Sequence, residues 1–203
     1  MTAYGIKPDG KRTVLGVSVS LSEAEEHWRT FLRGLKTRGL HGIEMITSDA
    51  HAGLKAALKT EFAGVNWQRC QFHLQQNASS YVPKIEMRKD VAEDIRSIFN
   101  APNLEEAKRM LDLTVTKYKG KASKLASWME EKLPESFSCF KCPSHHRKRL
   151  RTSNMAEVCN REIKRRTRVI GIFPNESSLL RICSAYLKSL DERWESGITY
   201  LTI

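Results

Sequence analysis

Two carboxylates in this sequence occupy positions from which they could act on phosphate esters. Asp49 follows a short apolar run, so we expect it at the C-terminal tip of a strand, where open α/β sheets usually build their sites. Glu157 lies in an expected helix, and Arg161, Lys164 and Arg168 follow it at spacings of four, seven and eleven residues. These spacings place the carboxylate and the cations on one helix face. Carboxylates that hold divalent ions, beside cations that hold phosphates, are what polynucleotide cleavage and joining requires.

Each carboxylate also has a purely structural interpretation. Asp49 precedes an expected helix and could be its N-cap. Glu157 follows Asn154 by three residues, as in a capping box. Capping is the commoner use of such residues when each is considered alone, so the surrounding sequence has to decide.

Positive charge is concentrated in one stretch of the chain. The 203 residues contain 34 Lys and Arg against 23 Asp and Glu, for a formal net charge of +11. The stretch 145–168 holds much of this excess, and such a run is the electrostatic footprint of a phosphate-backbone partner. A solvated basic face is the alternative, whereas an anionic membrane is disfavoured because no broad apolar face adjoins the run. The predicted DNA-binding residues are Arg147, Lys148, Arg149, Arg151, Arg161, Lys164, Arg165 and Arg168.

The cysteines raise the possibility of a different metal site. Cys70-x-x-His73 and Cys139-x-x-Cys142 offer four ligands of the kind that structural zinc prefers. The two pairs are far apart in sequence and no ribbon or finger pattern surrounds them, which argues against zinc. Five cysteines without a secretory signal pattern argue against a disulfide framework and favour a cytoplasmic protein. No apolar run reaches the length of a membrane span.

The elements that must position these residues begin with a β-hairpin. Strand-like segments at 4–6 and 13–19 flank a Lys-Pro-Asp-Gly turn. A Ser22/Glu25 capping box then predicts a helix that ends at Gly39. Its expected buried face comprises Ala24, Trp28, Phe31, Leu32 and Leu35.

The rest of the chain reads as mostly helical. Before residue 86 we expect strands at 43–47 and 67–70 and helices at 51–59 and 72–81. After it we expect helices over 86–133 with a break at 100–103, followed by a basic loop at 134–151. A further helix is expected from Ser153 or Asn154 to about Arg168. The last predicted helix is amphipathic, and its apolar face presents Leu179, Cys183, Tyr186, Leu187 and Leu190.

Six stretches of the chain carry a family signature. They are LKTRGLHG at 35–42, SDAHAGLKAA at 48–57, WQRCQFH at 67–73, RTSNMAE at 151–157, NREIKRRTR at 160–168 and GIFPN at 171–175. In this order, over nearly the whole chain, they resemble the catalytic core of Mutator-type transposases of bacterial insertion sequences. Together these motifs are highly specific.

The resemblance implies an α/β, ribonuclease H-like core with an all-helical insertion. Residues 1–80 would form the first part of the core, 81–140 the insertion, and 141–203 the C-terminal part with the glutamate-bearing basic helix. The resemblance also implies that Asp49 and Glu157 are the second and third acidic residues of a DDE triad. They would bind Mg²⁺ or Mn²⁺ as metal ligands.

Cys70 and His73 match the C-x-x-H signature of the family, which is not a zinc site there. The resemblance implies that His73 positions catalytic groups or DNA. A histidine satisfied within the core is the alternative.

The first acidic residue of the triad has no counterpart that we can identify. The family carries it on a strand upstream of the hairpin, whereas here Asp9 lies in a turn, Glu44 begins a strand, and the helix holds Glu23, Glu25 and Glu26. We therefore expect the first strand to be missing and this polypeptide alone to be catalytically impaired.

The resemblance implies that the intact protein would cleave transposon ends and join them to target DNA. It would act as a homo-oligomer on DNA, associated with the nucleoid. The rival hypothesis is a non-catalytic DNA-binding protein.

Overall fold

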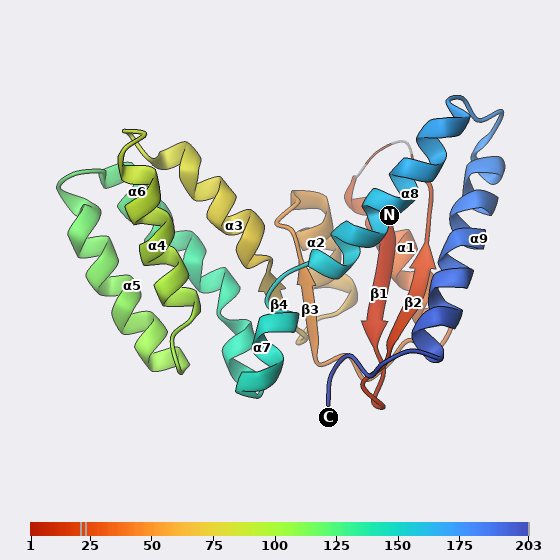
Figure 1. The fold of residues 1–203 in the computed structure, drawn as a ribbon, viewed down its shortest axis with the longest axis horizontal. Coiled ribbons are helices and arrows are strands. Elements are labelled where there is room, and N and C mark those ends of the chain that lie inside the picture. Colours follow the sequence, from red (N-terminus) through yellow and green to blue (C-terminus); the bar gives the residue numbers. More distant parts are fainter. Residues whose placement is uncertain (21, 23, 203) are drawn as a thin grey trace. The chain divides into compact units, whose positions relative to one another are not determined.

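The chain is a mixed α/β protein, mostly helical with small sheets (Figure 1). A computed structural model describes residues 1–20, 22 and 24–202, so Glu23 lies outside the described residues. The strands are β1 (Thr2–Ile6), β2 (Arg12–Val17), β3 (Met45–Ser48) and β4 (Asn66–Arg69). The helices are α1 (Glu25–Thr37), α2 (Ala52–Glu61), α3 (Gln71–Ala78), α4 (Met87–Phe99), α5 (Leu104–Lys119), α6 (Ser123–Lys132), α7 (Ser144–Leu150), α8 (Asn154–Ile170) and α9 (Glu176–Glu195), with 3₁₀ turns η1 (Ser79–Tyr81), η2 (Leu133–Ser136) and η3 (Ser138–Lys141).

The chain divides into two units, each with its own sheet and core. The first comprises residues 1–42, 51–64 and 154–203, and the second comprises residues 43–50 and 65–153.

In the first unit, β1 and β2 form the expected antiparallel hairpin, with a bulge between Ala3 and Tyr4. Helix α9 packs along β2 (Figure 1). The C-terminal segment of the chain binds the hairpin turn. The Gly10 carbonyl accepts hydrogen bonds from the backbone N–H groups of Tyr200 and Leu201, at 2.9 and 3.0 Å. The core of this unit contains Cys159, Leu187, Leu190 and Trp194, against which Tyr4, Val14 and Val17 pack.

Helix α1 begins differently from the prediction. Its N-cap is Ala24, which makes no side-chain capping bond, so the expected Ser22/Glu25 capping box does not form. The Ser22 hydroxyl lies 3.0 Å from Nδ1 of His27 instead. Ala24 is exposed because it precedes the helix, while Phe31, Leu32 and Leu35 are buried as predicted.

In the second unit, β3 and β4 pair in parallel, from Met45 opposite Asn66 to Ser48 opposite Arg69. Helices α3 to α6 enclose a larger core, and Figure 1 shows α4, α5 and α6 lying side by side. Its fully buried side chains include Leu74, Ile95, Ile98, Leu125, Met129 and Leu133.

The prediction of a loop over 134–151 is wrong. The segment forms the end of η2, then η3 and α7. Phe137, Cys139 and Phe140 are buried in the core of the second unit, and His146 is buried as well. These apolar residues stand in short 3₁₀ turns, which are too brief for a periodic pattern to reveal their burial.

Candidate active site

The carboxyl ends of β3 and β4 bring the candidate catalytic residues together. Asp49 directly follows β3, and Cys70 joins β4 to α3. Parallel strands end at the same edge of a sheet, and here the Cys70 N–H donates to the Ser48 carbonyl at 2.8 Å. His73 follows in the first turn of α3. The prediction of Asp49 at a strand tip is confirmed.

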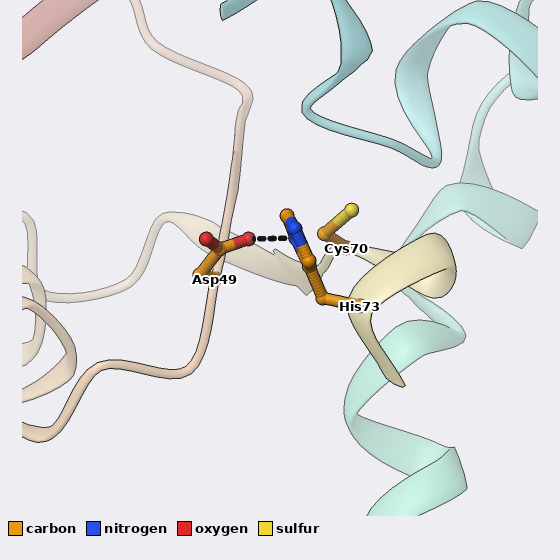
Figure 2. Close-up of side chains that lie close together, drawn as sticks. All are labelled: Asp49, Cys70 and His73. Atoms are coloured by element: carbon orange, nitrogen blue, oxygen red, sulfur yellow. Dashed lines mark ion pairs between the residues drawn. The ribbon is translucent and has the colours of Figure 1, made fainter. Parts of the chain in front are cut away.

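Asp49 and His73 form an ion pair through Oδ1 and Nδ1, as Figure 2 shows. The Asp49 side chain is 54% exposed and that of His73 is 29% exposed, so solvent reaches the carboxylate although Nδ1 of His73 is itself buried. One ligand atom each from Asp49, Cys70 and His73 lie within 4.8 Å of one another. A carboxylate that orients an imidazole can position that ring for proton transfer or for contact with a phosphate.

The segment that precedes α8 is tied to this strand end. Thr47 Oγ1 donates to the Leu150 carbonyl at 2.6 Å, and the Gln71 N–H donates to the Arg151 carbonyl at 3.0 Å. Ser153 then donates its backbone N–H to Cys70 Sγ at 3.4 Å and its hydroxyl to Asp49 Oδ1 at 3.5 Å. Sequence reasoning missed Ser153 as a site residue, although it lies in the RTSN stretch that pointed to the family.

Asp49 does not cap α2, contrary to its structural interpretation. The helix begins at Ala52, its N-cap is His51, and no side chain caps it. The Asp49 carboxylate is turned to His73 and Ser153 instead.

The four-ligand zinc arrangement is not assembled. Cys139 Sγ accepts from the Gln71 amide at 3.6 Å, and Cys142 Sγ lies 3.9 Å from Met45 Sδ. Burial raises the pKa of the Cys139 thiol to about 11 and also raises that of Cys142, which disfavours the thiolates that zinc binds. Within the described part of the chain, the one group of at least three candidate metal ligands is Asp49, Cys70 and His73.

Glu157 lies in the first turn of α8, in the first unit, so its role as a metal ligand stays a prediction. The cations that share its predicted face, Arg161, Lys164 and Arg168, are all exposed. Arg165 is exposed too, but it contacts Glu162 at 3.2 Å, and hydrogen bonding to Arg165 lowers the pKa of Glu162.

The predicted DNA-binding residues before α8 fall into two groups. Lys148 and Arg149 are exposed on α7. Arg147 donates to three backbone carbonyls, those of Pro102, Phe140 and Cys142, at 2.7 to 3.4 Å. Arg151 donates to the Phe99 carbonyl at 3.1 Å and to Asn100 Oδ1 at 2.8 Å. Arg147 and Arg151 thus tether chain segments of the second unit, and a DNA contact by them stays a prediction.

The fold and site define a mixed α/β protein with a carboxylate and an imidazole at a strand end and a strongly basic helix. Among the described residues, no helix combines the length and apolar character needed to cross a membrane. The chain belongs to the Mutator family of transposases, because the model of that family matches residues 1–197. The resemblance inferred from the sequence motifs is thereby confirmed at the level of the family.

Curated relatives agree with this assignment. The chain is 51% identical over 201 residues to the transposase for insertion sequence element IS406 of Burkholderia multivorans, covering 99% of this chain and 52% of that protein. It is 36% identical over 203 residues to the ISRM5 transposase of Rhizobium meliloti, covering 100% and 51% of the two chains. It is 34% identical over 194 residues to the IS256 transposase of Staphylococcus aureus, covering 95% and 49%. The chain thus spans about half the length of the curated relatives it matches.

Proposed function

We propose that this chain is the greater part of the catalytic core of a DNA transposase, which cleaves DNA at the ends of an insertion sequence and joins the 3′-hydroxyls to target DNA. The observation that carries the proposal is the exposed Asp49–His73 pair at a strand end of a Mutator-family chain. The relatives are named as transposases of insertion sequence elements, which supports the same activity here. We expect the protein to act as a multimer on DNA, associated with the nucleoid.

The proposed core is ribonuclease H-like, with one further strand beside β1 or β3. The outer edge of β2 is already covered, because Asp191 accepts from the Val14 N–H at 2.7 Å and Arg38 donates to the Leu15 carbonyl at 2.7 Å. The outer side of β4 is met by η2 and η3, with Ser138 donating to the Trp67 carbonyl at 2.7 Å. Among the described strands, this leaves β1 and β3 as the places where we propose that a further strand pairs.

Asp49 and Glu157 are the proposed metal ligands, and their chemistry fits a hard divalent cation. Both offer carboxylate oxygens, the ligands that Mg²⁺ and Mn²⁺ prefer. His73 and Ser153 both contact Oδ1 of Asp49, and Figure 2 shows the other oxygen pointing away from His73. We expect that second oxygen to face the ion. The ion, when bound, would activate the attacking oxygen and stabilise the leaving one.

His73 and the cations have supporting roles in this proposal. The ion pair with His73 fixes the rotamer of Asp49, so that its carboxylate is oriented before DNA arrives. The exposed side chains of Arg161, Lys164 and Arg168 would bind backbone phosphates, which positions the strand without reading its sequence.

We expect the chain alone to be inactive, because we identify no first aspartate of the triad among its described residues. The test is manganese-dependent nicking of a supercoiled plasmid, which requires no knowledge of the element's ends. The 203-residue chain is compared with a chimera that carries the upstream strand segment of the Burkholderia multivorans relative. We expect nicking by the chimera only, abolished by Asp49→Asn or Glu157→Gln. Nicking that survives both substitutions would refute the assigned site.

A non-catalytic DNA-binding role is the second candidate, favoured by the exposed cations of α8. Titration of Mn²⁺ into the chain by calorimetry separates the two. The catalytic proposal requires weaker Mn²⁺ binding in Asp49→Ala and Glu157→Ala. Unchanged Mn²⁺ binding together with retained DNA affinity would favour the non-catalytic role.

A further inference from the structure

The side chain of Phe72 is placed where the fold does not explain it. It is 50% exposed, although its neighbours in the first turn of α3 are the buried Gln71 and the partly buried His73. The buried residues of this helix are Gln71, Leu74 and Ala78, spaced so that they form one face toward the core. Phe72 lies about 100° away from Gln71 around the helix axis and so points off that face.

The ring of Phe72 lies beside the candidate active site. It makes a T-shaped contact with the ring of His73, with centroids 5.5 Å apart and planes at 67°. His73 in turn pairs with Asp49. A T-shaped contact covers only part of a ring, so the exposed half of Phe72 leaves aromatic surface on which a planar group can stack.

Another exposed aromatic of the same unit has a structural explanation. Tyr81 is 42% exposed, but its ring stacks on Trp128 with centroids 5.2 Å apart and planes at 25°. Phe72 is the one phenylalanine among the exposed large hydrophobic residues of the described chain.

The surroundings of Phe72 favour a planar π ligand over an apolar protein partner. Protein docking surfaces are contiguous apolar patches. Here a single exposed ring contacts the imidazole of His73, which itself pairs with the Asp49 carboxylate. Bases are stacked inside a duplex, so the face of a base is accessible to a protein ring only where its nucleotide is unstacked. An exposed aromatic ring stabilises such a nucleotide by stacking on its base.

We propose that Phe72 is a stacking platform that holds an unpaired base of DNA next to the phosphate at Asp49. This inference rests on the proposed function, since it takes the Asp49–His73 pair as the place of cleavage. It makes Phe72 a positioning residue, whose contribution is to binding of single-stranded DNA rather than to duplex binding in general.

The test measures fluorescence anisotropy of three labelled DNAs in EDTA, so that no cleavage occurs. The probes are a single strand of about 20 thymidines, a duplex of the same length, and an abasic strand of the same length. We expect Phe72→Ala to weaken binding of the thymidine strand roughly 5- to 150-fold, the range that stacking of one base supplies. Binding of the duplex and of the abasic strand should change little.

Two further variants control the result. Ile85→Ala removes another exposed apolar side chain, 78% exposed and in the same unit, and should leave all three affinities unchanged. Phe72→Trp should retain the affinity for the thymidine strand and add tryptophan fluorescence that this strand quenches. If Phe72→Ala fails to fold, the quenching measured in Phe72→Trp still tests whether residue 72 stacks on a base.

The proposal is overturned if Phe72→Ala changes no affinity, if it weakens the thymidine and abasic strands equally, or if the Phe72→Trp fluorescence is not quenched. Equal losses would mean that Phe72 serves the fold or a protein contact. Failure of the proposed function is separable, because that depends on Mn²⁺ binding and nicking in the Asp49 and Glu157 variants. A catalytic failure with an intact stacking effect would leave Phe72 as a single-strand DNA contact only.

Discussion

At the scale of single residues, the contacts of several polar side chains distinguish between the roles that the sequence allowed. Asp49 had two interpretations, and its contacts with His73 and Ser153 separate it from the helix that it could have capped. Arg147 and Arg151 are bound by backbone carbonyls rather than left for solvent. A residue type alone therefore predicts which chemistry is possible, and its contacts decide which is used.

Glu61 is a residue whose contacts predict a structural role. Its side chain is only 6% exposed, and it lies 3.4 Å from Arg29, 2.8 Å from Arg33 and 3.8 Å from Lys36, all on α1. We expect Glu61→Gln to lower the free energy of unfolding by about 1–3 kcal/mol, less than a fully buried pair because the cations are partly solvated. Urea unfolding would measure the loss. The control is Glu131→Gln, whose side chain is 71% exposed and which should change stability little.

Gly10 and Gly39 form a matched pair for testing a close backbone approach. Both have positive φ, at 77° and 95°, a conformation that costs other residues energy. A Cβ at Gly10 would lie 1.8 Å from the Leu201 carbonyl oxygen, whereas a Cβ at Gly39 would meet nothing within 4 Å. We expect Gly39→Ala to cost about 1 kcal/mol and Gly10→Ala clearly more, because it also displaces the C-terminal segment. Thermal unfolding compares the two, and equal losses would contradict the contact.

At the scale of elements, α8 separates its charges by face. Arg166 packs over the ring of Tyr186 at 4.6 Å and contacts Glu162 at 3.4 Å, so this arginine serves the fold. Arg161, Lys164 and Arg168 are exposed. The helix thus exposes a short row of cations while its other side packs on α9.

Replacing this row tests its role in DNA binding. We expect the triple substitution of Arg161, Lys164 and Arg168 by alanine to weaken duplex binding and to reduce the slope of log affinity against log salt by about 3. The control triple replaces Lys108, Lys119 and Lys124, which are exposed on or next to the core helices of the second unit. Salt-dependent anisotropy titrations measure both. Equal effects of the two triple substitutions would show that the three cations of α8 contribute only through the net charge of the chain and form no DNA-binding row.

At the scale of the whole molecule, two cores predict two regions of distinct stability. Ile95 is fully buried in the second unit and Leu187 is 2% exposed in the first. Each alanine substitution should cost about 2–5 kcal/mol. We expect Ile95→Ala to reduce hydrogen-exchange protection mainly in α4, α5 and α6, and Leu187→Ala mainly in β1, β2 and α9. A uniform loss along the chain in both variants would indicate one cooperative unit instead.

The sequence determined the family and most helices by itself. Six motifs in order pointed to Mutator transposases. The helical spacing of residues such as Ile95, Ile98 and Leu111 predicted the buried faces of their helices, because the period of an α-helix is only a few residues and is visible in a short stretch of sequence. The hairpin was predicted for the same reason, since its turn and strands are local.

The tertiary structure decided what depends on residues far apart in the chain. It set the parallel pairing of β3 with β4, which brings Asp49 to His73, and it buried Phe137 and Phe140 within a segment predicted to be a loop. It also turned Arg147 and Arg151 toward backbone carbonyls and left Phe72 exposed beside His73. Such outcomes follow from packing between segments that are distant in the sequence. The free energy of that packing cannot be read from a local sequence pattern.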